Sequence, residues 1–260
     1  MNHTQQRVGF IGGGRVARVL AGGWRHAGVF PVDVLVSEPD DTAFGKLAEL
    51  CPDVRRASME EAAAAAVVFV ALHPPVLVSG MPALRACLDA HAIVVSLAPK
   101  IPLSSLTAGL GTPHVARMIP NAPSIIGRGF NPVAFGDGLD AAARRDLSAL
   151  FAPWGAWPEV PERDLEIYAI LTGMGPTYYW YQWQALRDVA VQFGLSPERT
   201  DEALHEMLNG AQATLLRSGL TPAAVMDLIP VRPLQAIEES VAAAYGTALP
   251  ALYAKIRPTP

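Results

Sequence analysis

Residues 8–17 read Val-Gly-Phe-Ile-Gly-Gly-Gly-Arg-Val-Ala, an apolar run that passes directly into a glycine turn. The turn fits the G-x-G-x-x-G/A pattern with Gly12, Gly14 and Ala17. In this pattern the first glycine permits a tight turn and the second lets the backbone approach a pyrophosphate. The small third residue lets the following helix pack closely on the strand. The stretch therefore predicts a dinucleotide-binding turn, and an ordinary strand–turn–helix is the alternative.

The strands and helices that follow place this turn in a doubly wound α/β fold. The strand candidates are continuous apolar runs, which are typical of a parallel sheet covered on both faces. They are Arg7–Ile11, Asp33–Ser37, Val67–Leu72, Ile93–Leu97, His114–Met118 and Val133–Phe135. The helices predicted between them are Val16–His26, Thr42–Leu50, Met59–Ala65 and Val76–Ala90. This alternation predicts an N-terminal Rossmann-type sheet.

The chain changes character at Pro153–Pro161, beyond which it reads as helix only. The predicted helices are Glu162–Leu171, Pro176–Phe193, Pro197–Ser218, Pro222–Leu228 and Pro233–Lys255. Prolines open most of them, as is common in first helical turns. We therefore predict two domains, residues 1–158 and 159–260. A helical domain of about 100 residues with long apolar faces is marginal alone, so we expect it to dock on a second copy, as a homodimer or a higher multiple.

Composition and charge argue against several classes of protein. The chain has 260 residues, of which 51% are hydrophobic, and a net charge of -4 without a basic stripe, which argues against nucleic-acid binding. The longest apolar stretch, Ala62–Leu72, is too short to span a bilayer, and no signal peptide is visible, so no membrane partner is expected. Cys51 and Cys87 form neither a disulfide framework nor a zinc spacing, which fits a reducing cytoplasm and no metal site.

The residues expected around the cofactor lie in the glycine turn and in loops after later strands. At the end of the second strand, Glu38 would bind the ribose 2′-OH of NAD, whereas Ser37 would accommodate the 2′-phosphate of NADP. Glu38 and Asp40 would repel a phosphate, so the sequence leans to NAD but leaves NADP open; a solvated acidic turn is the alternative. The predicted cofactor-binding residues are Gly12, Gly13, Gly14, Arg15, Val16, Ser37, Glu38, Leu72, His73, Pro74 and Asn121.

Three of the later segments have both a functional and a structural interpretation. His73 would donate to the ribose or to a substrate, or has no role on a surface loop. Asn121, rigid between two prolines, would orient a nicotinamide or a substrate carbonyl, or it caps a turn. The break at residues 171–180 exposes N–H groups that would bind an anion, or it is a kink between packed helices.

These segments, taken in order, resemble the pyrroline-5-carboxylate reductase family. Its members show an Ile-Gly-x-Gly-x-Met-Ala turn, a Val-Lys-Pro loop, an Arg-x-Met-Pro-Asn-x-Pro strand end and a Ser-Gly-Ser-Gly-Pro-Ala helix break. This chain has residues 11–17, 72–74, 117–123 and 172–177 in the corresponding places. The resemblance implies a Rossmann domain, a helical dimerisation domain with interlocked subunits, and NAD(P)H-dependent reduction of a cyclic imine.

The chain departs from the family pattern where that pattern holds the substrate. The family's Ser-Pro-Gly-Gly-x-Thr segment, whose backbone and threonine hold the substrate carboxylate and ring nitrogen, reads Ile-Pro-Val-Arg-Pro-Leu at residues 229–234. Its Ala-Ala-Gly loop is replaced at residues 97–100, and Met174 replaces the second serine of the helix break. We therefore expect a substrate other than ordinary pyrroline-5-carboxylate, bound by Met174, Gly175, Arg232 and Leu234. For Arg232, an ion pair with Glu238 or Glu239 on the surface is the alternative.

The choice of reaction depends on whether a proton donor is needed. An iminium acceptor needs a positioned hydride and little acid catalysis, whereas a ketone needs a donor for the developing alkoxide. Related hydroxyacid dehydrogenases place a lysine on the helix that here begins at Pro176, and this helix has none. Imine reduction is the leading interpretation, with Thr172, Thr177 and Tyr178 as catalytic candidates. A ketone or hydroxyacid reductase and a non-catalytic dinucleotide-binding regulator are the alternatives.

Overall fold

The computed structural model describes residues 6–258, so the outermost ends of the predicted domains, residues 1–5 and 259–260, lie outside the described residues. The chain divides into two compact units. The first unit consists of the residues up to Met174 together with the C-terminal segment that begins at Leu252, and the second unit is Gly175–Ala251.

The first unit is built on a seven-stranded sheet in the order β3-β2-β1-β4-β5-β6-β8. Its strands are β1 (Arg7–Ile11), β2 (Asp33–Ser37), β3 (Val54–Arg56), β4 (Val67–Val70), β5 (Ile93–Ser96), β6 (Val115–Met118) and β8 (Val133–Phe135). Neighbouring strands from β3 to β6 run parallel, and β8 is antiparallel to β6. Two short strands, β7 (Gly129–Phe130) and β9 (Gly155–Ala156), pair separately.

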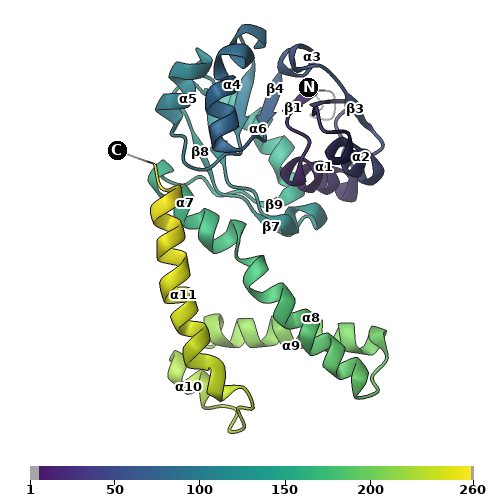
Figure 1. Cartoon of the computed structure of the whole chain (residues 1–260), viewed down its shortest axis with the longest axis vertical. Helices are drawn as coiled ribbons and strands as arrows, with labels where there is room; N and C mark the ends of the chain where they lie inside the picture. The colour runs from purple at the N-terminus through teal and green to yellow at the C-terminus, as the bar shows by residue number, and fades with distance from the viewer. Residues whose placement is uncertain (1–5, 259–260) are drawn as a thin grey trace. The chain divides into compact units, whose positions relative to one another are not determined.

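Helices cover both faces of the sheet, as Figure 1 shows. One face carries α1 (Arg15–Ala27), α2 (Asp41–Leu50) and α6 (Ala141–Phe151), and the other carries α3 (Met59–Ala63), α4 (Pro74–Cys87) and α5 (Leu103–Leu110). The first face is packed with buried aromatic rings, in which the Trp24 and Trp154 indoles donate to backbone oxygens of Leu150 and Leu20, both at 2.8 Å. The predicted doubly wound fold is thus confirmed.

Several elements of this unit were missed from the sequence, among them β3, α5, α6 and the short strands β7 and β9, and one strand direction was wrong. The edge strand β3 has only three residues. The helix α5 is rich in serine, threonine and glycine, which are poor helix formers, while α6 follows an Asp140 cap that the sequence displays. The strand β8 is antiparallel because no crossover helix lies between β6 and β8.

The first unit extends beyond the predicted boundary after residue 158. A short turn at Glu162–Asp164 leads into α7 (Leu165–Tyr168) and a π-helical turn (Ala169–Gly173). Leu165 and Ala169 are buried against residues of the β6 and β8 region, so apolar packing holds this segment to the sheet unit. The predicted helix Glu162–Leu171 is therefore irregular, and the compact unit ends sixteen residues later than the predicted domain.

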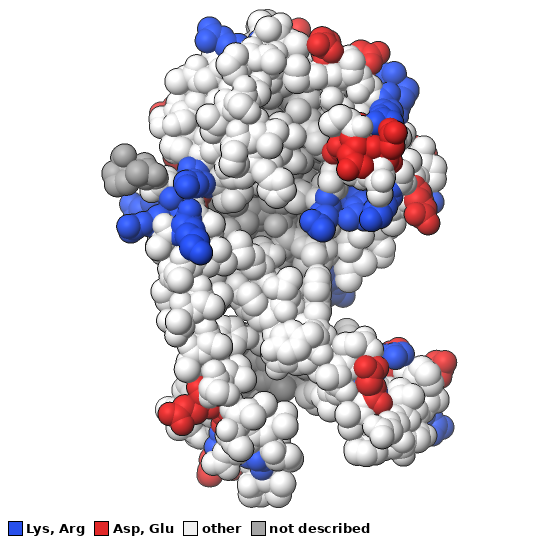
Figure 2. Space-filling model, in the orientation of Figure 1, with Lys and Arg blue, Asp and Glu red and all other residues white. Residues whose placement is uncertain are grey.

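The second unit consists of α8 (Pro176–Gln192), α9 (Pro197–Arg217), α10 (Pro222–Met226) and the part of α11 (Gln235–Ile256) that ends at Ala251. Ser196 and Thr221 accept N–H bonds at the starts of α9 and α10, each followed by proline. Large apolar side chains remain exposed on these helices, and Figure 2 shows wide uncharged surface over them. The predicted helices are confirmed in type and order.

Candidate functional site

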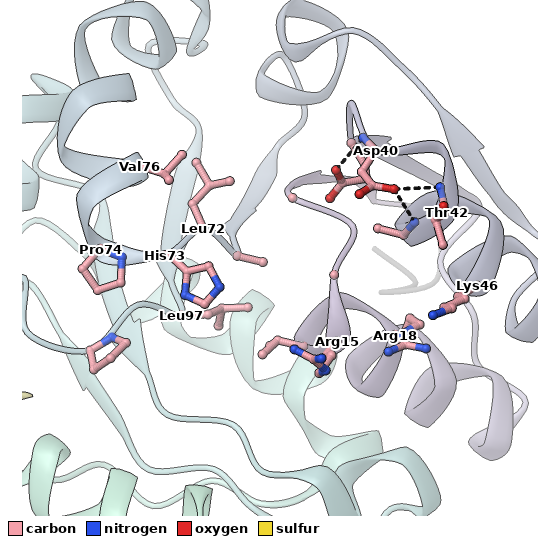
Figure 3. A pocket seen from close by; sticks show the side chains of 17 residues that line it. Arg15, Arg18, Asp40, Thr42, Lys46, Leu72, His73, Pro74, Val76 and Leu97 are labelled. Atoms are coloured by element: carbon pink, nitrogen blue, oxygen red, sulfur yellow. Dashed lines mark hydrogen bonds between the residues drawn. The ribbon is translucent and has the colours of Figure 1, made fainter. Parts of the chain in front are cut away.

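A cavity of about 800 Å³ lies at the carboxyl ends of the central strands. The strand order reverses between β1 and β4, which continue to β2 on one side and β5 on the other. Ligands of doubly wound folds bind at such a switch point. Figure 3 shows the lining side chains, which come from the loops after β1, β2, β4 and β5 and from the N-terminal halves of α1 and α4 and the first two turns of α2. The lining residues are Gly12, Gly14, Arg15, Val16, Arg18, Glu38, Asp40, Thr42, Ala43, Lys46, Ala71, Leu72, His73, Pro74, Val76, Leu97 and Pro99.

The glycine turn has the geometry that a pyrophosphate requires. Gly12 has φ +100°, and a Cβ there would lie 2.7 Å from the Ala71 carbonyl oxygen, so both conformation and space demand glycine. A Cβ on Gly14 would meet nothing within 4 Å, because this residue faces the cavity. A side chain at Gly14 would thus fill space without disturbing the described protein atoms around it. This open space is where the second glycine of the pattern admits a ligand.

The start of α1 is prepared for an anion. Gly14 precedes the helix in an extended conformation and offers no side-chain cap, and the first turn holds no acidic residue. The first N–H groups of a helix have no partner within it, and its dipole favours negative charge there. A dinucleotide pyrophosphate fits this end of α1.

Glu38 closes the turn from the end of β2. Its carboxylate accepts N–H bonds from Gly13 at 2.8 Å and Asp40 at 2.9 Å. The Ser37 carbonyl accepts from the Gly12 N–H at 2.9 Å, but Ser37 does not line the cavity. Of the two residues predicted to read the ribose, the structure therefore brings Glu38 to the cavity.

The other predicted residues of the first unit divide into two groups. Leu72, His73 and Pro74 line the cavity where β4 leads into α4. Asn121 does not: its Oδ1 accepts from the Phe130 N–H at 3.0 Å, and its Nδ2 donates to the Thr172 carbonyl at 3.2 Å. Asn121 thus ties the end of β6 to the π-helical turn, and its orienting role stays a prediction.

Two further predicted residues lie at the end of the first unit. The Thr172 hydroxyl donates to the Tyr168 carbonyl at 2.9 Å, within the π-helical turn. Single π-helical turns are frequent at functional sites. The Met174 N–H closes the turn by donating to the Ala169 carbonyl at 2.9 Å, and Met174 is the last residue before the second unit.

The remaining predicted residues, Gly175, Thr177, Tyr178, Arg232 and Leu234, belong to the second unit. Burial raises the pKa of the Tyr178 phenol, which keeps its proton at neutral pH. The Arg232 guanidinium is paired with the Glu238 carboxylate, which is one of the two alternatives weighed from the sequence. The Leu234 side chain is exposed.

The sequence reasoning missed several lining residues, of which Arg18, Thr42 and Lys46 carry polar groups. A signal for them was present. Arg15 and Arg18 are three residues apart on α1, and Thr42 and Lys46 are four apart on α2, so each pair shares one helix face. Among the described residues, no group of three or more His, Cys, Asp or Glu side chains is arranged to hold a metal ion. Over the same residues, none of the helices combines the length and the apolar character needed to cross a bilayer.

A glycine turn at the switch point of a doubly wound sheet, followed by a helical unit, defines a Rossmann-type dinucleotide-binding protein. Residues 7–100 match the family model "NADP oxidoreductase coenzyme F420-dependent", and residues 162–254 match "Pyrroline-5-carboxylate reductase dimerisation".

Individual relatives agree with these matches. The chain is 31% identical to pyrroline-5-carboxylate reductase of Pseudomonas aeruginosa, over 84% of this chain and 81% of the relative. The crystal structure of 1-pyrroline-5-carboxylate reductase from Streptococcus pyogenes is similar with a TM-score of 0.79, at 18% identity, over 98% of this chain and 99% of that one. The Plasmodium falciparum pyrroline carboxylate reductase with NADP bound has a TM-score of 0.71 at 19% identity, over 96% and 94%.

The chain therefore belongs to the pyrroline-5-carboxylate reductase family. It is an NAD(P)-dependent oxidoreductase of that type, and the glycine turn and α1 start described above fit the dinucleotide. The match to the dimerisation family supports the formation of an oligomer.

Proposed function

We propose that this protein reduces the C=N bond of an acidic imine other than ordinary pyrroline-5-carboxylate, with NADPH or NADH as the hydride donor. The observation that carries this proposal is the contrast between the two halves of the machinery. The glycine turn keeps its open pyrophosphate cradle, whereas the segment at residues 229–234 has lost the two glycines and the threonine of the family pattern.

The chain's own residues would divide the work as follows. The α1 start and Glu38 hold the dinucleotide, whose nicotinamide supplies a hydride when it is bound. Leu72, Leu97 and Pro99 form an apolar part of the cavity wall and would keep water from the reacting face. A positively charged imine needs positioning more than acid catalysis, so Tyr178, Thr177 and Thr172 would act as donors only if the product nitrogen requires a proton.

Arg232 is our candidate for the substrate's acid group. A guanidinium suits bidentate contact with a carboxylate or a phosphate, and here it would replace the backbone donors of the family segment. Arg232 is paired with Glu238 in the second unit, and a substrate anion would compete with that carboxylate. Met174, Gly175 and Leu234 would shape the rest of the substrate's surroundings.

The proposal is tested by the oxidation of NADPH and NADH with a panel of cyclic imino acids, in which pyrroline-5-carboxylate is one member. A lost hydrogen-bonded anchor for a charged group costs about 1.5–3 kcal/mol, so kcat/KM for pyrroline-5-carboxylate should be at least about tenfold below that of the best imine. If pyrroline-5-carboxylate is the best substrate, the altered segment has been over-interpreted. If a ketone is turned over and no imine is, or if the dinucleotide binds without any turnover, imine reduction is wrong.

A variant pair isolates the role of Arg232. We expect Arg232→Ala to raise the substrate KM about tenfold, which is roughly 1.4 kcal/mol, and to leave dinucleotide affinity unchanged. Arg217→Ala, which removes an exposed arginine at the end of α9, is the matched control. Equal kinetics of the two variants would contradict the role of Arg232.

We also propose that the oligomer is a homodimer or a multiple of it, which works in the reducing cytoplasm. The exposed apolar side chains of α8 to α11 need a cover, and Cys51 and Cys87 are both free thiols. Sedimentation should give twice the 27.6 kDa chain mass or a multiple. A monomer at micromolar concentration would contradict the dimer.

A further inference from the structure

Three positive side chains on the cavity wall have no partner among the residues that the structure describes. Arg15 and Arg18 on α1 and Lys46 on α2 line the cavity, and none of them makes a hydrogen bond or an ion pair with any residue in the described part of the chain. They also line the adjoining groove between α1 and α2, where Glu49 is present but is not within ion-pair distance. Unpaired cations that converge on a cavity favour an anionic ligand.

The acidic residues of the same cavity are already engaged. Glu38 accepts the Gly13 and Asp40 N–H groups at 2.8 and 2.9 Å, and Asp40 accepts the Thr42 and Ala43 N–H groups at 2.7 and 3.0 Å as the cap of α2. Charge-assisted bonds of this kind offset part of the negative charge. Glu38 and Asp40 should therefore repel a phosphate less strongly than two carboxylates without hydrogen-bond donors would.

The cations fall into two groups along the helices. Arg15 lies in the first turn of α1, beside the free N–H groups that fit the pyrophosphate. Arg18 lies one turn further along α1, and its side chain approaches that of Lys46 from α2 in Figure 3. Thr42 precedes Lys46 by one turn on the same face of α2, and no described group bonds to its hydroxyl. Guanidinium, ammonium and hydroxyl donors thus surround a space beyond the pyrophosphate cradle.

We infer that Arg18, Thr42 and Lys46 bind a phosphomonoester, the 2′-phosphate of NADPH, and that the protein selects NADPH over NADH. This inference rests on the proposed function and deepens it by naming the dinucleotide that the site selects, and it reverses the slight preference for NAD inferred from Glu38 and Asp40. The adenosine ribose lies at the end of β2 in folds of this kind, and β2 leads through Asp40 directly into the helix that carries Thr42 and Lys46. A phosphate on the 2′-oxygen adds about 1.5 to 2 negative charges, which Arg18 and Lys46 would balance.

The experiment measures dinucleotide binding without substrate, so its result does not depend on whether the protein reduces imines. Calorimetric titration of the full-length protein with NADPH and NADH should give a Kd for NADPH at least about tenfold lower. Arg18→Gln and Lys46→Gln should each raise the Kd for NADPH by about tenfold or more and leave that for NADH within about twofold. Arg145→Gln, which removes an exposed positive charge on α6 away from the cavity, is the matched control and should change neither.

Two fragments separate the sources of a phosphate. Adenosine 2′,5′-bisphosphate should bind more tightly than 5′-AMP and lose this advantage in both variants. Inorganic phosphate should weaken NADPH binding more than NADH binding. Equal or tighter binding of NADH by the unaltered protein would overturn the inference. Variants that weaken the binding of both dinucleotides equally would also overturn it, because the cations would then bind the pyrophosphate. The inference would fail as well if inorganic phosphate weakened NADPH binding to the same extent in the variants as in the unaltered protein.

Discussion

The buried ion pair between β6 and α7 offers a quantitative test of what holds the first unit together. The Arg117 side chain is 0% exposed and that of Glu166 is 1% exposed, and the guanidinium bonds to Glu166 Oε1 and, at 2.9 Å, to Glu162 Oε1. Glu166 Oε1 also accepts the Lys100 N–H at 2.9 Å. The pair therefore joins α7 both to the sheet and to the loop after β5, and Glu166→Gln would remove its negative charge with little change in shape.

The cost of that change follows from the burial. Removing one partner of a buried pair costs about 3–5 kcal/mol, because the remaining charge stays uncompensated. Glu162, whose side chain is 30% exposed, remains beside Arg117, and the glutamine oxygen still accepts a hydrogen bond. We therefore expect the low end, a loss of about 3 kcal/mol in the free energy of unfolding, or about 6–12 °C in Tm for a unit of this size.

Urea unfolding followed by circular dichroism measures this loss. Glu162→Gln, at the more exposed partner, should cost only about 1 kcal/mol. In a cycle with Arg117→Met, the double variant should lose at least about 1 kcal/mol less than the sum of the single losses. A Glu166→Gln protein within about 1 kcal/mol of the parent, or an additive cycle, would show that the buried pair does not hold the first unit together.

Three further predictions follow from individual residues. Gly14→Val should leave the protein folded, because a Cβ meets nothing within 4 Å, with a loss of at most about 1 kcal/mol at the start of α1. It should weaken dinucleotide binding by at least about a hundredfold in calorimetry; unchanged affinity would show that the pyrophosphate lies elsewhere. Lys100 has φ +76°, a left-handed backbone conformation that strains a residue with a Cβ. Lys100→Gly should raise the free energy of unfolding by about 0.5–1 kcal/mol, because the relief of about 1–2 kcal/mol of backbone strain exceeds the entropy that glycine adds to the unfolded chain. Lys100→Ala, which keeps a Cβ, should give no gain. Burial raises the pKa of the Cys51 thiol. At about pH 8 iodoacetamide should therefore modify half-buried Cys87 in the native protein and spare Cys51, which should react only at higher pH, when its thiolate forms. Mass spectrometry that shows early modification of Cys51 would contradict this.

The fold was predictable because its signals are local. The glycine turn, the continuous apolar strands and the prolines that open the later helices each lie within a few residues of the feature they specify. The elements that were missed lack such a signal or depend on distant contacts. The edge strand β3 has three residues. The extension of the first unit to Met174 involves contacts between residues far apart in the chain, namely the burial of Leu165 and Ala169 beside Ile119 and Ala134 and the pairing of Arg117 with Glu166, 49 residues later.

The site was predictable where a backbone requirement selects the residue type, and less so where two elements must meet. Gly12 and Gly14 were predicted because the turn itself demands them. Arg18 and Lys46 were missed because their common direction depends on how α1 and α2 lie together on one face of the sheet. Asn121 illustrates the opposite case, in which a rigid polar segment is visible in the sequence but its amide is used to tie β6 to the π-helical turn.

Membership of the family and a change of substrate are compatible, because different positions carry them. Hydride chemistry needs the glycine turn, and that turn is kept with the backbone conformation of Gly12 and the open space at Gly14. The proposed change of substrate rests on the segment at residues 229–234, where the family pattern has glycines whose backbone N–H groups would approach the carboxylate. In the proposed function, Val231 and Arg232 would place side chains where the family pattern has glycines, so the backbone would not hold a carboxylate in the same way. A chain that kept its cofactor turn and replaced its substrate cradle would retain the reaction and change what it reduces.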